Sequence, residues 1–401
     1  MRRAIKFLGF FLGAALLIFL LVFGLNRSSF EMLFENRDAM AEGSEWVEKT
    51  YSMLGLTEYI EAHPDMVSIA SVVPGQPGSA IYLRENTPRS MGALSNFFIL
   101  AAYSAAFEQG DMDPSRKLDW DSISKYQLPQ VGETIHQAAY REGLEKGFIE
   151  EDGTIRTDHA VRLLADNNSL ALADYLLIRL GKEPVRALYE EMNLDNTDPP
   201  LPFSGLFITL APSIQRVSHD SLLAGWSSEP RAALEESAYM NSERFSAGDV
   251  RDEWLEILQE DRLGNNFMQE RDLLALFPQT TANDITRALT DVWNGDFISE
   301  DASKRILDWL LYADETAISR NFREYAALYD NRIGLLNGID AGISADTGET
   351  TIQAVFFDQI HIAVWFHMSS NHMHQDFQQR LIWDPELKER MKDVTERFVI
   401  N

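Results

Sequence analysis

The chain has 401 residues, of which 45% are hydrophobic and 11% aromatic, so it can bury a large core and is not an intrinsically disordered protein. It carries 35 Lys and Arg against 62 Asp and Glu, a formal net charge of −27. A surface this acidic repels phosphates, which excludes a nucleic-acid-binding function. The chain has no cysteine, so disulfides, thiolate metal sites and a cysteine nucleophile are excluded too.

The N-terminus has the pattern of a membrane anchor. Residues 1–6 include Arg2, Arg3 and Lys6, and residues 7–25 contain no charge at all. This apolar run is longer than the core of a cleavable signal peptide, which spans about 7–15 residues. We therefore predict a cytoplasmic tip at 1–6, an uncleaved transmembrane anchor at 7–25, and an extracytoplasmic, periplasmic location for the remaining chain.

The segment after the anchor leads into the main domain. Residues 26–62 are acidic and are predicted to form a juxtamembrane helical segment, with the domain at 63–400. Residues 66–73 and 79–83 are predicted strands, joined by a turn rich in Pro and Gly. Residues 97–107 are apolar apart from Ser104, which predicts a helix enclosed on all sides.

The second half alternates helical and strand patterns. Helices are expected at 132–146, from 157 and from 170, and residues of about 205–275 are predicted to be a helical insertion. A strand is expected at 332–340, followed by a hairpin of 351–357 and 360–368 and a final helix from Asp384. This order predicts an α+β fold: a mainly antiparallel five-stranded sheet flanked by helices, plus a helical subdomain.

Three short segments together resemble the motifs of the class A β-lactamases and penicillin-binding proteins, which are serine acyltransferases. Residues 88–96, before the enclosed helix, resemble the family's P-x-x-x-G-S-x-x-K turn. The second segment resembles its S-D-N and the third its K-[ST]-G. The matching residues are Ala165, Asp166 and Asn167 for the second motif, and Leu336, Asn337 and Gly338 for the third.

The reactive residues of these motifs are replaced. Ala93 stands at the position of the serine nucleophile, and Asn96 at that of the lysine that would take its proton. Ala165 replaces the S-D-N serine, Leu336 and Asn337 replace the Lys and the hydroxyl residue of K-[ST]-G, and no acidic residue between 195 and 212 is a convincing activator of water. The resemblance thus implies a catalytically degenerate member that uses no cofactor or metal and binds cell-wall peptide or an envelope protein.

Two alternatives remain open. The first is an active serine hydrolase, cleaving β-lactams or transferring peptide acyl groups, whose nucleophile is displaced: Ser122 and Lys125 form a true S-x-x-K, and Ser90 and Ser95 flank Ala93. The second is a structural envelope protein in which residues 205–275 form the binding surface.

The histidines near the C-terminus are a further cluster. His361 and His367 would share one side of a predicted strand, with His372 and His374 close in sequence. Because no other ligand type accompanies them, we interpret the cluster as a solvated strand end and predict no metal site.

Overall fold

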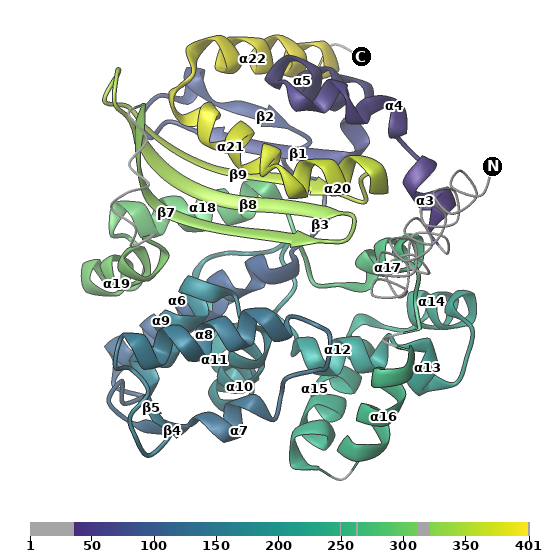
Figure 1. The fold of residues 1–401 in the computed structure, drawn as a ribbon. Coiled ribbons are helices and arrows are strands. Elements are labelled where there is room, and N and C mark those ends of the chain that lie inside the picture. Colours follow the sequence, from purple (N-terminus) through teal and green to yellow (C-terminus); the bar gives the residue numbers. More distant parts are fainter. Residues whose placement is uncertain (1–35, 249, 262–263, 312–320, 400–401) are drawn as a thin grey trace, which may run out of the picture.

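The computed structural model describes residues 36–248, 250–261, 264–311 and 321–399, and they form the predicted α+β fold (Figure 1). One five-stranded sheet has the order β2-β1-β9-β8-β7, and every neighbouring pair is antiparallel. Its strands are β1 Val67–Val72, β2 Ile81–Leu83, β7 Phe322–Arg332, β8 Leu335–Ser344 and β9 Thr350–Asp358. Two short sheets pair β3 Arg89–Ser90 with β6 Gln279–Thr280, and β4 Lys117–Asp119 with β5 Thr154–Arg156.

The sheet joins the two ends of the chain, as predicted. Val67 of β1 pairs with Phe357 of β9, and the register continues to Val72 opposite Ile352. Successive residues of a strand point to opposite faces, so Phe357 enters the core on one side of the sheet and Phe356 the core on the other.

The structure differs from the predicted strands near the C-terminus in two ways: one predicted strand is a helix, and one strand was missed. Residues 360–368 belong mostly to helix α20, Ile362–Ser370, because an apolar run this short has no period that separates a buried helix from a buried strand. Strand β7 was not predicted at all. It lies at the sheet edge, and only some of its residues are buried, so charged side chains interrupt its apolar pattern. The predicted strand at 332–340 is β8, entered through a tight turn at Ile333 and Gly334.

Helices from both ends of the chain cover one face of the sheet (Figure 1). They are α5 Met53–Ala62, α20, α21 Met373–Trp383 and α22 Pro385–Val399. Leu56 and Tyr59 of α5 are fully buried in this core, so part of the predicted juxtamembrane segment belongs to the domain. The short helices around α5 are α3 Arg37–Ala41, α4 Ser44–Val47, η1 Lys49–Tyr51, η2 Pro64–Met66 and η3 Pro77–Ser79.

The enclosed helix is α6, Asn96–Gln109, and each of its residues from 96 to 106 is buried. Ser104, the polar break in the apolar run, donates its hydroxyl to the Ala302 carbonyl at 2.8 Å, which makes its burial tolerable. The turn η4, Gly92–Ser95, leads into α6 from β3. Helix α18 Ala282–Asn294 packs against the inner strands β1 and β9, and α19 Glu300–Leu310 packs against α6 and the edge strand β7.

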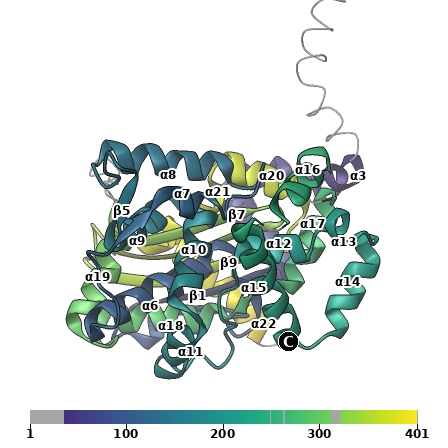
Figure 2. The ribbon, with the colours of Figure 1, turned by 90° about the horizontal axis from the view of Figure 1, so that it is seen from below.

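The remaining helices form two neighbouring groups (Figure 2). One holds α7 Trp120–Ser124, α8 Glu133–Glu145, α9 Thr157–Asn167, α10 Leu170–Leu180 and α11 Lys182–Glu191. The other, the insertion, holds α12 Phe203–Thr209, α13 Pro212–Gln215, α14 His219–Ser228, α15 Arg231–Ala247, α16 Arg251–Asp261, α17 Phe267–Leu273 and η5 Leu274–Leu276. Asp174 of α10 connects the groups, since its carboxylate accepts the N–H groups of Phe203 and Ser204 at the start of α12.

No helix in the described ranges is both long and apolar enough to cross a membrane, and the predicted anchor at 7–25 lies outside those ranges.

Candidate functional site

The turn before α6 is shaped by a contact with the edge strand β7. Gly92 has a φ of +53°, and a Cβ atom placed on it would lie 1.9 Å from Oδ2 of Asp330. Only glycine fits this position, for its conformation and for its space. The turn can therefore approach β7 closely, and Ala93 follows it with a methyl group that is 3% exposed.

Asp330 accepts a hydrogen bond from the backbone N–H that a reacting acyl group would need as a donor. The backbone N–H of Ala93 donates to Asp330 Oδ2 at 2.7 Å, and the N–H of Asn331 donates to Oδ1 at 2.9 Å. In acyl transfer, N–H donors beside the nucleophile stabilise the developing oxyanion. Here the donor at the nucleophile position already holds a carboxylate of the same chain.

Asn96 is part of a chain of amide contacts. Its Nδ2 donates to Oδ1 of Asn168 at 3.1 Å, and Nδ2 of Asn168 donates to the carbonyl of Tyr329 at 3.0 Å. Amides have no useful basicity near neutral pH, so this chain holds α6, α9 and β7 together but cannot take a proton from a nucleophile.

Asn168 was missed by the sequence reasoning, which assigned the second motif to Ala165, Asp166 and Asn167. Asn168 ends α9 in the left-handed conformation, with a φ of +56°. Asn is one of the few residues that adopt this conformation readily. The two consecutive asparagines after Asp166 were the available signal, since the second of them is well suited to end a helix.

The three residues assigned to the second motif lie on α9 and have other partners. Asp166 forms ion pairs with Arg162 at 2.9 Å and Lys146 at 3.1 Å. Asn167 donates to Glu142 at 2.6 Å, and Ala165 packs at the edge of the core. Of the three, Asn167 lines the cavity that contains Ala93.

The three residues assigned to the third motif lie on β8, inside the sheet. Leu336 packs in the core under α20–α22, and Asn337 donates to the Ser90 carbonyl at 2.6 Å. A Cβ on Gly338 would lie 2.3 Å from Gln378. The wall beside Ala93 comes from strand β7 and not from β8. Because β7 was not predicted, its residue Asp330 was missed as a site residue.

The serines proposed as displaced nucleophiles donate their hydroxyls elsewhere. Ser122 bonds Asp119 at 2.6 Å as part of the cap of α7, and Lys125 is exposed. Ser90 donates to the Leu274 carbonyl and Ser95 to the Gly92 carbonyl. Neither Ser122 nor Lys125 lines the cavity that contains Ala93.

The C-terminal histidines do not share a strand face, because His367 lies on α20, His361 caps it, and His374 lies on α21. His361 bonds the Tyr59 hydroxyl at 3.1 Å. Burial lowers the pKa of His374 to about 4. Within the described ranges, no three His, Asp or Glu side chains are grouped to hold a metal ion.

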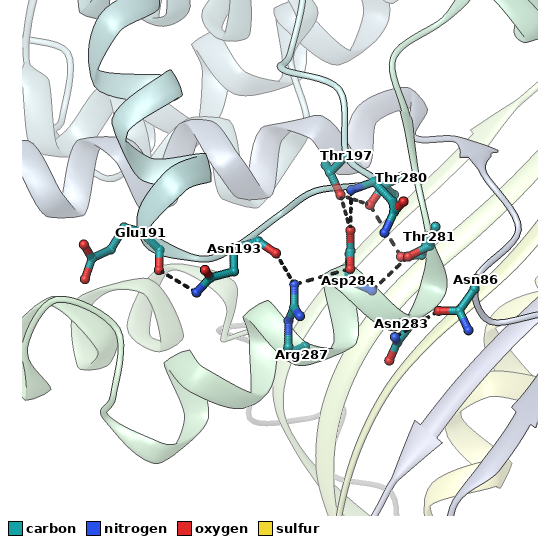
Figure 3. A network of polar contacts seen from close by, with 10 residues as sticks. Asn86, Glu191, Asn193, Thr197, Thr280, Thr281, Asn283, Asp284 and Arg287 are labelled. Carbon is teal, nitrogen blue, oxygen red and sulfur yellow. Dashed lines mark hydrogen bonds and ion pairs between the residues drawn. The ribbon is translucent and has the colours of Figure 1, made fainter.

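The segment before α12 is tied down by the start of α18 (Figure 3). Asp284 accepts from the N–H of Asn196 at 3.1 Å and from the hydroxyl of Thr197 at 3.2 Å. Asp198 accepts from the N–H of Gln279 at 3.0 Å and pairs with Arg231. The carboxylates of Asp284 and Asp198 therefore attach this segment to the neighbouring elements.

Two adjoining cavities open along the β7–β8 hairpin. The first, of about 410 Å³, contains Ala93, Asn168 and Asp330; we call it the Ala93 cavity. The second, of about 350 Å³, lies between the hairpin and the insertion; we call it the Arg332 cavity. They share four lining residues, Val131, Gly132, Asn331 and Arg332.

No protein-family model matches this chain, and no curated protein does. Solved structures do match. A β-lactamase from Sphaerobacter thermophilus is 11% identical over 83% of this chain and 100% of that chain, with a TM-score of 0.50. A β-lactamase from Chitinophaga pinensis is 11% identical over 85% and 98%, with a TM-score of 0.49. The penicillin-binding protein PBP-A is 11% identical over 81% and 96%, with a TM-score of 0.47.

The chain thus has the β-lactamase-like fold that the three degenerate motifs predicted. That fold is common to β-lactamases and penicillin-binding proteins, and it does not by itself give this chain an activity.

Proposed function

We propose that this chain is a membrane-anchored, extracytoplasmic β-lactamase-like protein that binds its ligand in the two cavities without acylation. The ligand we propose is cell-wall peptide or an envelope protein, and the anchor is residues 7–25.

The observation that carries the proposal is the contact between Ala93 and Asp330. A methyl group stands at the nucleophile position, and the N–H beside it is bonded to a carboxylate at 2.7 Å. A substrate carbonyl would meet neither a nucleophile nor a free donor at this point.

An active hydrolase with a displaced serine is the second candidate, and the contacts of the serines speak against it. Ser90, at 0% exposure, and Ser95, at 1%, both donate their hydroxyls to backbone carbonyls. Ser122 has a carboxylate partner, but it lies outside the Ala93 cavity.

The test uses soluble peptidoglycan fragments and the full chain, with binding measured by isothermal titration calorimetry and cleavage measured by mass spectrometry. The variant Ala93→Trp fills the Ala93 cavity, and Ala187→Trp is the matched control because Ala187 lines a separate cavity. We expect binding without cleavage, lost in Ala93→Trp and kept in Ala187→Trp. Cleavage of the fragments, or binding that Ala93→Trp leaves unchanged, would contradict the proposal.

A further inference from the structure

The Arg332 cavity has mostly apolar walls from several elements. Phe207 and Leu210 come from α12, Leu273 from α17 and Trp365 from α20, and Phe277 follows η5. A volume of about 350 Å³ is within the range of small-molecule sites. The insertion therefore forms much of a pocket that opens beside the Ala93 cavity.

Arg332 is the polar group at the junction of the two cavities. Its guanidinium lies over three phenylalanine rings, 5.7 Å from the centre of Phe203, 5.0 Å from that of Phe207 and 5.8 Å from that of Phe277. Its side chain is 18% exposed, so most of its hydration is lost. Cation–π contacts with these rings offset part of the free energy of desolvation and fix the plane of the guanidinium.

The charge of Arg332 is incompletely paired. Its Nε is buried and has no hydrogen-bond partner, and Asp330 is the one carboxylate among the described residues that comes within 4.0 Å of it. Both oxygens of Asp330 accept backbone N–H groups at shorter range, from Ala93 and Asn331. A largely desolvated cation without a direct hydrogen-bonded partner is unfavourable, and a ligand anion would relieve the cost.

The charge balance limits the ligand to a single negative charge. Glu270 also lines the Arg332 cavity, and the protein as a whole carries −27. A second carboxylate on the ligand would meet this negative field, with no further arginine or lysine among the described residues that line either cavity.

We propose that the Arg332 cavity binds one carboxylate attached to an apolar group. Arg332 holds the carboxylate, and the apolar group packs among Phe207, Phe277 and Trp365. This inference rests on the proposed binding function and names its ligand class. The C-terminus of a peptide with an apolar last residue and a free apolar acid both have this chemistry.

Four probes separate these sources in calorimetric titrations of the full chain: the peptide acetyl-Ala-Ala-Phe as the free acid and as its C-terminal amide, and 3-phenylpropionate and 3-phenylpropionamide. We expect each acid to bind at least tenfold more tightly than its amide. A peptide source predicts that the peptide acid binds more tightly than 3-phenylpropionate, and a free-acid source predicts the reverse.

Substitutions then test whether Arg332 causes the preference for each acid over its amide. Arg332→Gln should reduce the ratio of acid to amide affinity to about 1, Arg332→Lys should keep part of it, and Arg216→Gln, at a side chain 78% exposed, should leave it unchanged. Circular dichroism reports whether each variant folds, and the comparison of acid with amide in the unchanged protein needs no variant.

Equal binding of acid and amide by the unchanged protein, or a preference that survives in folded Arg332→Gln, would overturn the inference. Neither result contradicts the proposed function as long as peptidoglycan fragments bind and Ala93→Trp abolishes that binding. If Ala93→Trp leaves fragment binding unchanged, the proposed function is contradicted instead.

Discussion

The Ala93 cavity and the Arg332 cavity share a wall, but their polar groups are arranged in opposite ways. Beside Ala93, the polar groups are bonded to one another: Asp330 holds the Ala93 N–H, and Asn96 and Asn168 are joined by their amides. Beside Arg332, a cation packs on aromatic rings, and Asp330, 4.0 Å from its Nε, is bonded at shorter range to backbone N–H groups.

This difference separates stability from binding. Polar groups that satisfy one another stabilise the turn before α6 and leave little for a ligand. A cation that lacks a full partner adds less to stability and is available to bind. In the proposed function, the turn before α6 therefore has a structural role, and ligand binding depends on the groups beside the insertion.

The largest loss of stability is expected when the contact between Gly92 and Asp330 is disturbed. Gly92→Ala should lower the free energy of unfolding by roughly 3–5 kcal/mol, because the new methyl group needs the left-handed conformation and displaces Asp330. Gly110→Ala is the control, since Gly110 has a φ of +76° but open space around its Cβ, and it should cost only about 1 kcal/mol. Equal losses of stability in chemical denaturation would show that the contact with Asp330 is unimportant.

A buried acid, Asp340, bonds Tyr329 of the Ala93 cavity, and its titration gives the second effect. The Tyr329 hydroxyl donates to Asp340 at 3.1 Å, and burial, followed by the charge of Glu324, raises the pKa of Asp340 to about 7. Between pH of about 4 and 7 the unfolded chain releases this proton while the folded chain keeps it, so Asp340 makes the fold less stable as pH rises through that range.

Asp340→Asn should remove this dependence. The difference in unfolding free energy between the original protein and the variant should change by on the order of 2 to 4 kcal/mol between pH 4 and pH 8, with the original protein gaining at low pH. Urea denaturation of both proteins at the two pH values measures it. A difference that is the same at both pH values would mean that Asp340 is ionised throughout.

Removing the carboxylate at Ala93 should have a smaller effect. Asp330→Ala should cost about 1–3 kcal/mol and increase hydrogen exchange of the Ala93 amide, because that N–H loses a charge-assisted bond. Asp330→Asn keeps an acceptor oxygen and should retain part of the protection. Hydrogen exchange followed by mass spectrometry of peptides that cover residues 90–96 makes the comparison, and unchanged exchange in Asp330→Ala would argue against the contact.

The smallest effect is expected at Asn168. Asn168→Gly keeps a residue that accepts a φ of +56° but removes the amide bridge between Asn96 and Tyr329, and it should cost about 1 kcal/mol. Asn168→Ala adds backbone strain and should cost about 1 kcal/mol more. If both substitutions cost the same in thermal denaturation, the left-handed conformation would contribute nothing.

The sequence was sufficient for the parts of the fold that depend on local patterns. The run before Gly110 predicted the enclosed helix α6, and residues 66–83 predicted the pairing of β1 with β2. The fold class followed from the order of such elements and from the resemblance of three short segments to the motifs of a known family.

The candidate site was harder to predict because its residues act through contacts distant in sequence. Asp330 reaches Ala93 across more than 200 positions, and it lies on a strand whose exposed edge hides its period. Arg332 is distinguished by its surroundings, two phenylalanine rings from α12 and that of Phe277 after η5. A single sequence does not show that these rings converge on it.

The central claim is that the nucleophile position no longer forms an acyl-enzyme, and intact-mass spectrometry of the full chain after incubation with benzylpenicillin tests it most directly. The geometry at Ala93 and Asp330 predicts an unchanged mass at every time point. A stable mass increase of one benzylpenicillin, mapped to any serine of the chain, would contradict it.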